Sequence, residues 1–228
     1  MSVAATHTQQ LIASSSKATK EEHAYVILWS SETWKQICKL YGHSLTVTKI
    51  RFSFDDAFLL TVSRDRSWRL YQKSESATEP YTLVCAKEKA HSRIIWDCSW
   101  THDGCYFATA SRDKTVKIWK VQDCNGDCSE QLTLSFEEAV TACDFASIDK
   151  HIYHLALGLE NGQIILIDLQ PDERGGLEVI KRETVSDSLT HNGVVKAVKW
   201  RPRANSKLAQ LATAGEDHSV RIFSIFNE

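Results

Sequence analysis

The chain has 228 residues, of which 43% are hydrophobic, and a formal net charge of −2 at neutral pH. This length can bury a sizeable core, and the nearly balanced charge argues against a dedicated polyanion-binding protein. No apolar run approaches the roughly 18 residues of a membrane-spanning helix and no secretory signal is recognisable, so we expect no membrane association. The seven cysteines, without framework spacing, predict a reduced, intracellular protein.

The first 40 residues contain three short apolar segments, at 11–15, 25–29 and 34–40. Polar residues at 17–23 separate the first segment from the second and predict an enlarged turn. Short apolar runs of this length, bounded by turn formers, are typical of strands. We therefore expect residues 1–40 to form a sheet unit that lacks its first strand.

The clearest structural unit runs from His91 to Trp119, with the sequence HSRIIWDCSWTHDGCYFATASRDKTVKIW. Two short apolar runs flank the turn at Asp103-Gly104, and residues 115–119 then alternate between polar and apolar types. Alternation with a period of two indicates a half-buried strand, and no helical stripe competes with it. Three strands and two turns are therefore predicted in this unit.

The same residue types recur along the chain at a period of about 45, which is typical of β-propeller blades built from four-stranded sheets. We expect an all-β propeller of about four and a half blades in an incomplete ring, and hence a fragment of a longer protein. The predicted units are a partial blade (1–40), three blades (41–89, 90–135 and a degenerate 136–186) and a blade lacking its last strand (187–228). The recurring residues are His43, Thr61, Asp65 and Tyr71; His91, Thr109, Asp113 and Trp119; and His191, Thr213, Asp217 and Phe223.

These repeats resemble the WD40 family. That resemblance implies a buried hydrogen-bonded chain of His, Ser or Thr, Asp and Trp in each blade, and only the 90–135 unit has all four members. The Tyr71 hydroxyl could substitute for the indole in the unit before it, whereas Phe223 has no hydrogen to donate. In the degenerate unit, which has Asn161 at the aspartate position, Leu157 and Ile167 leave packing alone to hold the blade.

Longer segments, among them SSSKATKEEHAYVILWSSETWKQICKL, HSRIIWDCSW, SRDKTVKIW and GEDHSVRIF, resemble the C-terminal half of the Elongator complex subunit 2 family, whose members carry two seven-bladed propellers. The resemblance implies a non-catalytic scaffold subunit, cytoplasmic and nuclear, without a cofactor. Its partners would be the scaffold and catalytic subunits, and it would support wobble-uridine modification of tRNA with indirect contact to the tRNA. A generic WD40 adaptor or receptor for a peptide or histone remains an alternative, as does direct RNA binding.

Neither a catalytic nor a metal site is predicted. A hydroxyl, an imidazole and a carboxylate could suggest a hydrolase triad, but here they recur at fixed repeat positions and no nucleophile elbow is present. Cys124 and Cys128 lack a second ligand pair at zinc spacing. His151 and His154 would point to opposite faces of a strand.

Two predicted turns carry cations on both sides of the recurring aspartate. Arg64 and Arg66 flank Asp65, and Arg112 and Lys114 flank Asp113, whereas the later turns carry Glu160 and Glu216. An ordinary solvated turn is one interpretation. The other is a protein-contact surface, because Arg is favoured where acidic groups are recognised. Four candidate partner contacts follow: Arg64, Arg66, Arg112 and Lys114.

Overall fold

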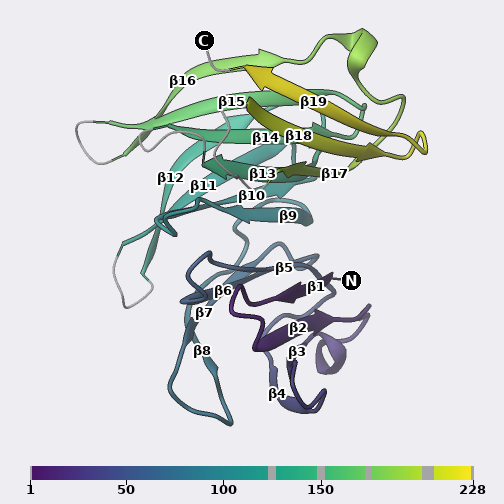
Figure 1. The fold of residues 1–228 in the computed structure, drawn as a ribbon. Helices are drawn as coiled ribbons and strands as arrows, with labels where there is room; N and C mark the ends of the chain where they lie inside the picture. Colours follow the sequence, from purple (N-terminus) through teal and green to yellow (C-terminus); the bar gives the residue numbers. More distant parts are fainter. Residues whose placement is uncertain (1, 123–126, 148–151, 173–175, 202–207, 227–228) are drawn as a thin grey trace.

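The structure is a computed structural model that describes residues 2–122, 127–147, 152–172, 176–201 and 208–226. It contains five antiparallel sheets in chain order, four of four strands and one of three (Figure 1). The first sheet comprises β1 (Ser2–Ala5), β2 (Leu11–Ser15), β3 (Val26–Ser30) and β4 (Gln36–Leu40). The second comprises β5 (Val47–Phe52), β6 (Phe58–Ser63), β7 (Trp68–Lys73) and β8 (Tyr81–Lys87).

The remaining sheets continue the pattern. The third comprises β9 (Ile95–Trp100), β10 (Tyr106–Ser111), β11 (Thr115–Val121) and β12 (Cys128–Ser135). The fourth comprises β13 (Val140–Ser147), β14 (Tyr153–Leu159), β15 (Ile164–Pro171) and β16 (Leu177–Thr184). The fifth comprises β17 (Val195–Trp200), β18 (Leu208–Gly215) and β19 (Val220–Phe226). Two short 3₁₀ turns, Glu21–His23 and Asp187–Leu189, lie in loops.

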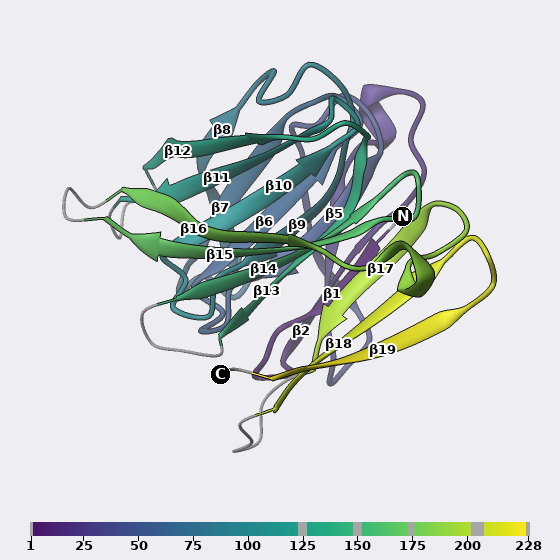
Figure 2. The same cartoon turned by 90° about the horizontal axis from the view of Figure 1, so that it is seen from above.

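The sheets follow one another as blades, each placing its first strand beside the first strand of the next (Figure 2). We number the sheets blade 1 to blade 5. Among the described residues no strand pairing joins blade 1 to blade 5. The expected all-β propeller architecture with an unclosed ring is therefore confirmed.

The expectation for residues 1–40 was wrong in one respect. Ser2–Ala5 forms a first strand, which pairs with β2 through registers such as Val3 with Ser14. Its segment SVAA is short and its residues are mostly small, so it gives little apolar periodicity. Pairing with β2 and contact with β5 hold it in place, and blade 1 has four strands.

Four apolar clusters hold the blades together, and each lies between two consecutive blades. Leu28 and Ile50 share one cluster between blades 1 and 2, and Trp68 and Phe107 share another between blades 2 and 3. Two further clusters join blade 3 to blade 4 and blade 4 to blade 5. A four-stranded sheet has two faces to bury, so each blade depends on its neighbours.

The first strands of neighbouring blades also share polar contacts. The Thr48 and Thr141 hydroxyls each donate to a backbone carbonyl of the next blade's first strand over 2.6 Å. The Lys49 ammonium lies 3.2 Å from the Asp97 carboxylate of the next blade. Asp144 accepts from the Trp200 backbone N–H at 3.0 Å and pairs with Lys199. These contacts fix the register of one blade against the next.

Two equivalent positions in different blades test whether each blade depends on burial by its neighbour. Ile118 and Ile222 occupy the same position in blades 3 and 5, five residues after the recurring turn aspartate, yet Ile118 is fully buried and Ile222 is 71% exposed. We predict that Ile118→Ala lowers the free energy of unfolding by about 2–5 kcal/mol, as for other buried aliphatic truncations. Ile222→Ala should change it by less than about 0.5 kcal/mol. Chemical denaturation of both variants measures the difference, and equal losses would contradict the burial argument.

Candidate interaction rim and its supporting network

The turns between the second and third strands of blades 2 to 5 share one backbone conformation. Each places a residue in the left-handed region just after the Asp or Asn position. The Asp or Asn side chain then accepts a backbone N–H two residues ahead, which closes an Asx turn. The left-handed residues are Arg66 (φ 73°), Lys114 (φ 68°), Gly162 (φ 94°) and His218 (φ 58°).

Blade 3 contains the complete hydrogen-bonded chain. The His91 Nδ1 lies 3.0 Å from Asp113 and its Nε2 lies 2.8 Å from the Thr109 hydroxyl. The Trp119 indole N–H donates to the same hydroxyl over 3.0 Å. A neutral imidazole protonated on Nδ1 satisfies every member, because Thr109 then donates to Nε2 while accepting from the indole. The chain ties the loop before the first strand to the rim turn.

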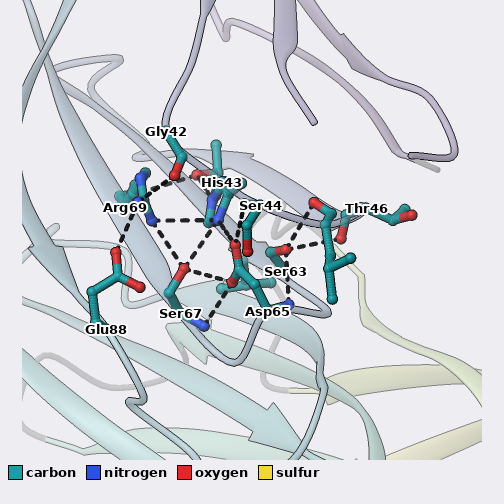
Figure 3. A network of polar contacts seen from close by, with 12 residues as sticks. Gly42, His43, Ser44, Thr46, Ser63, Asp65, Ser67, Arg69 and Glu88 are labelled. Carbon is teal, nitrogen blue, oxygen red and sulfur yellow. Dashed lines mark hydrogen bonds and ion pairs between the residues drawn. The ribbon is translucent and has the colours of Figure 1, made fainter. Parts of the chain in front are cut away.

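Blade 2 has a modified chain (Figure 3). His43 contacts Asp65 and Thr61, both at 2.9 Å. The Tyr71 hydroxyl donates its single hydrogen to the Tyr41 carbonyl over 3.2 Å and also has a side-chain hydrogen-bond contact with Thr61. Arg69 extends the network further, donating to Ser67 and to Glu88.

The last two blades have shorter chains. In blade 5, His191 lies 2.9 Å from Asp217 and 2.8 Å from Thr213, and Phe223 adds no hydrogen bond. In blade 4, Leu157 and Ile167 are buried in an apolar cluster. Packing alone occupies the network positions there.

The sequence analysis missed one member of the same system. In blade 1 the Trp29 indole N–H donates to the Ser14 hydroxyl over 2.8 Å, which matches the bond from Trp119 to Thr109. No histidine or turn aspartate accompanies this pair, so no repeat signature pointed to it. Ser14 and Trp29 lie on neighbouring strands but are not directly paired, since Ser14 lies opposite Ile27 and Trp29 opposite Ile12.

The turn carboxylates are held ionised by this network. Burial raises the pKa of Asp113, but hydrogen bonds from His91 and Thr115 outweigh it and hold that pKa well below its usual range. Burial also raises the pKa of Asp65, but the interactions with His43 and Ser67 outweigh this effect and lower the pKa. Both carboxylates are therefore hydrogen-bonded within their own blades, so little of their negative charge remains to pair with neighbouring cations.

Arg64, Arg66 and Arg112 are exposed on the rim. Within the described part of the chain, none of their side chains forms an ion pair or hydrogen bond. Lys114, the fourth candidate, differs from them. Its ammonium donates to the Glu137 carbonyl over 2.5 Å and lies 3.9 Å from the Glu138 carboxylate.

Backbone hydrogen bonds bring the cations of blades 2 and 3 together. The His91 N–H donates to the Arg66 carbonyl, and the Arg112 N–H donates to the Ile94 carbonyl. Arg93, exposed in the loop between these contacts, therefore joins the group and was missed by sequence analysis, which considered only the rim turns. We call Arg64, Arg66, Arg93 and Arg112 the basic rim.

Blades 4 and 5 place acidic groups on the same rim. Glu160 is exposed in the turn of blade 4, and Glu216 pairs with Lys196 in blade 5 over 2.5 Å. The rim is therefore basic over blades 2 and 3 and acidic or neutralised over blades 4 and 5.

Of the possible metal ligands, Cys124 and His151 lie outside the described residues. His154 contacts Asp168 over 2.6 Å within blade 4. Within the described ranges, no group of three potential ligands is assembled. No helix in those ranges is long and apolar enough to cross a membrane.

Comparison with known proteins agrees with the repeat geometry. The family described as "WD domain, G-beta repeat" matches residues 34–72 and 83–120. The chain therefore contains WD40 repeats, and the blade geometry agrees with these matches.

The chain is homologous to part of Elongator complex protein 2. It is 41% identical to that protein from Drosophila melanogaster over 98% of this chain and 29% of the relative. The human relative is 36% identical over 96% of this chain and 30% of its own length. The relative from Schizosaccharomyces pombe is 38% identical over 94% of this chain and 28% of its own. The chain thus spans about three tenths of these relatives.

The Trp119 indole distinguishes the networks of blades 3 and 5. Thr109→Val removes the hydroxyl that donates to His91 and accepts from Trp119, whereas Thr213→Val removes only the hydroxyl partner of His191. We expect Thr109→Val to lower the free energy of unfolding by about 1 kcal/mol more than Thr213→Val, because a buried indole N–H is left unpaired. Urea denaturation of both variants measures this difference, and matching losses would show that the indole bond contributes nothing.

The lowered pKa values also predict acid sensitivity. Because the folded-state pKa of Asp113 lies below the ordinary value of about 3.9, the ionised carboxylate stabilises the fold above that pH. This contribution is lost as the pH falls through and below that value. Asp113→Asn should therefore be less stable than the parent chain at neutral pH, with a deficit that shrinks below about pH 4. Denaturation midpoints across this range give the comparison, and a pH-independent deficit would contradict the assignment.

Proposed function

We propose that the chain acts as a non-catalytic protein-contact module of the Elongator complex, in which the basic rim binds an acidic surface of another subunit. Homology to Elongator complex protein 2 supports a role as an Elongator subunit. We further propose that the module helps to hold the scaffold and catalytic subunits together. It would thereby support wobble-uridine modification of tRNA, in the cytoplasm and nucleus.

One observation carries the rim assignment, namely that three arginines lie exposed on adjoining turns without a partner in the described chain. Asp65 and Asp113, the nearest carboxylates in sequence, are already engaged by His43 and His91. The arginine side chains are therefore available to an external carboxylate. Their backbones are fixed by the Asx turns and the buried network, so less conformational entropy is lost on binding.

The rim also carries a conformational cost. Arg66 adopts a left-handed φ of 73°, a conformation that costs an L-residue about 1–2 kcal/mol, whereas the equivalent turn of blade 4 has glycine. Glycine would relieve this strain but would remove the guanidinium. Arg66 therefore places a guanidinium on the rim at a conformational cost that glycine would avoid.

Direct RNA binding is the second candidate, because the same guanidinium groups could contact phosphates. The distribution of charge favours protein. Lys114 is engaged by blade 4, and Glu160 is exposed on the next turn, so the basic surface does not continue around the rim. A bipolar rim suits docking to one complementary protein surface.

Reversal of two rim charges tests the proposal. Arg64→Glu with Arg112→Glu should leave the melting temperature nearly unchanged, because both side chains are exposed and unpaired. Co-purification of the other Elongator subunits with the tagged chain should fall by about tenfold or more, as expected for removal of interface arginines. Wobble-uridine modification, measured by mass spectrometry of tRNA nucleosides, should fall with it.

The matched control is Lys35→Glu with Lys73→Glu, which makes the same charge change at exposed positions on the opposite rim. This control should assemble normally. Normal assembly of the Arg64 and Arg112 variant would refute the contact role. Strongly salt-dependent RNA binding by the parent chain, lost in that variant while subunit co-purification persists, would assign the rim to RNA instead.

A further inference from the structure

Two cysteines from different blades lie at the outer edge of the junction between blades 2 and 3. Cys85 is on β8, the outermost strand of blade 2, and Cys128 begins β12, the outermost strand of blade 3. Both pack, half-buried, against the apolar cluster that contains Trp68 and Phe107. Both are thiols in this structure. The junction therefore places one thiol from each blade at a surface that solvent reaches.

The two thiols are close enough to interact with each other. Burial raises the pKa of Cys128 most, and the Cys85 thiol raises it further through its charge and a side-chain hydrogen bond. Asp127, which precedes Cys128 in the chain, acts in the same direction. Because the thiolate is the form that reacts with oxidants, Cys128 is disfavoured as the first thiol to react. The first step is therefore assigned to Cys85 and the second to Cys128.

A second pair of cysteines crosses the next junction but lies in the interior. Cys98 on β9 and Cys143 on β13 are both fully buried, where the first strands of blades 3 and 4 contact each other. Burial raises the pKa of Cys98 to about 12 and that of Cys143 well above its usual value. Little thiolate forms at these sulfurs, and a dissolved oxidant does not reach them. Solvent access therefore distinguishes a reactive outer pair from an inert inner pair.

We propose that Cys85 and Cys128 form an oxidation site, at which hydrogen peroxide converts the two thiols into a disulfide between blades 2 and 3. The Cys85 thiolate attacks one peroxide oxygen, the O–O bond breaks, and Cys85 becomes a sulfenic acid. The hydroxide that leaves takes up the proton released by Cys85. The Cys128 sulfur then attacks the Cys85 sulfur, and the hydroxyl group leaves as water with the Cys128 proton. Two electrons thus pass from the sulfurs to the peroxide, and a thiol reductant returns them.

A disulfide at this site joins the two blades that carry the basic rim. It closes the segment from Cys85 to Cys128, which contains Arg93, Arg112 and the first three strands of blade 3. Covalent closure reduces the conformational freedom of the unfolded chain and so stabilises the fold. We expect the melting temperature of the oxidised chain to rise by about 5–15 °C. Oxidation therefore acts as a reversible lock on the junction between these blades.

Treatment of the purified 228-residue chain with hydrogen peroxide tests the site. The reduced protein has seven thiols, and stoichiometric peroxide should remove two of them, as measured with Ellman's reagent in denaturant. Digestion with Asp-N and Glu-C places Cys124, Cys128 and Cys143 in separate peptides. Mass spectrometry of this digest without reductant should identify a cross-link between Cys85 and Cys128. The melting temperature should rise on oxidation and return to its original value after dithiothreitol.

Three variants and the inner pair serve as controls. Cys85→Ser and Cys128→Ser should melt as the reduced parent does and should show no rise after peroxide. Cys124→Ser, which lies outside the described residues, should still form the cross-link. Cys98 and Cys143 should stay unmodified until the chain is unfolded. The peptide map of the parent chain decides the outcome even where a serine variant is destabilised. Retention of all seven thiols, a cross-link that excludes Cys85 or Cys128, or oxidation of the inner pair first would overturn the proposal.

Discussion

Burial of one blade's face by the next is the constraint on which the rest of the structure depends. A single sheet of three or four short strands cannot cover both of its own faces. The apolar clusters lie between blades, and the polar contacts of Thr48, Thr141 and Asp144 also cross between blades. Stability is therefore a nearest-neighbour property of the described blades.

The hydrogen-bonded chain from Trp119 to Asp113 adds to the stabilisation that packing between blades provides. It joins the loop before a blade to the turn within it, and so positions the rim turns of blades 2 and 3 relative to each other. Because the Asp113 carboxylate is hydrogen-bonded to His91 and Thr115, the Arg112 side chain remains available on the surface. The buried hydrogen-bonded network thus determines which charged side chains the rim presents to a partner.

The blades and their hydrogen-bonded networks could be predicted from the sequence, because the spacing of the repeated residues reflects the local geometry of a blade. The spacing from His91 to Asp113 and Trp119 identified the blade and its network. The sequence did not predict that Tyr71 contacts Tyr41 or that Lys114 contacts the Glu137 carbonyl, because these partners come from other segments that repeat spacing does not describe.

Ser2–Ala5 was missed because its pairing comes from β2 and its support from β5 rather than from its own pattern. The exposure of Ile222 agrees with the expected unclosed ring but is not indicated by the local residue pattern. Its immediate sequence matches that of Ile118, and only the presence or absence of a neighbouring blade distinguishes the two.

Hydrogen exchange compares these matching segments most directly. At a concentration where the chain is monomeric, the amides of β18 and β19 should exchange through openings of clearly lower free energy than those of β10 and β11. The strand sequences and internal pairings are similar, but among the described residues only the latter pair is covered by a following blade. Equal protection in the two pairs would show that each blade is stable by itself and would contradict the nearest-neighbour account.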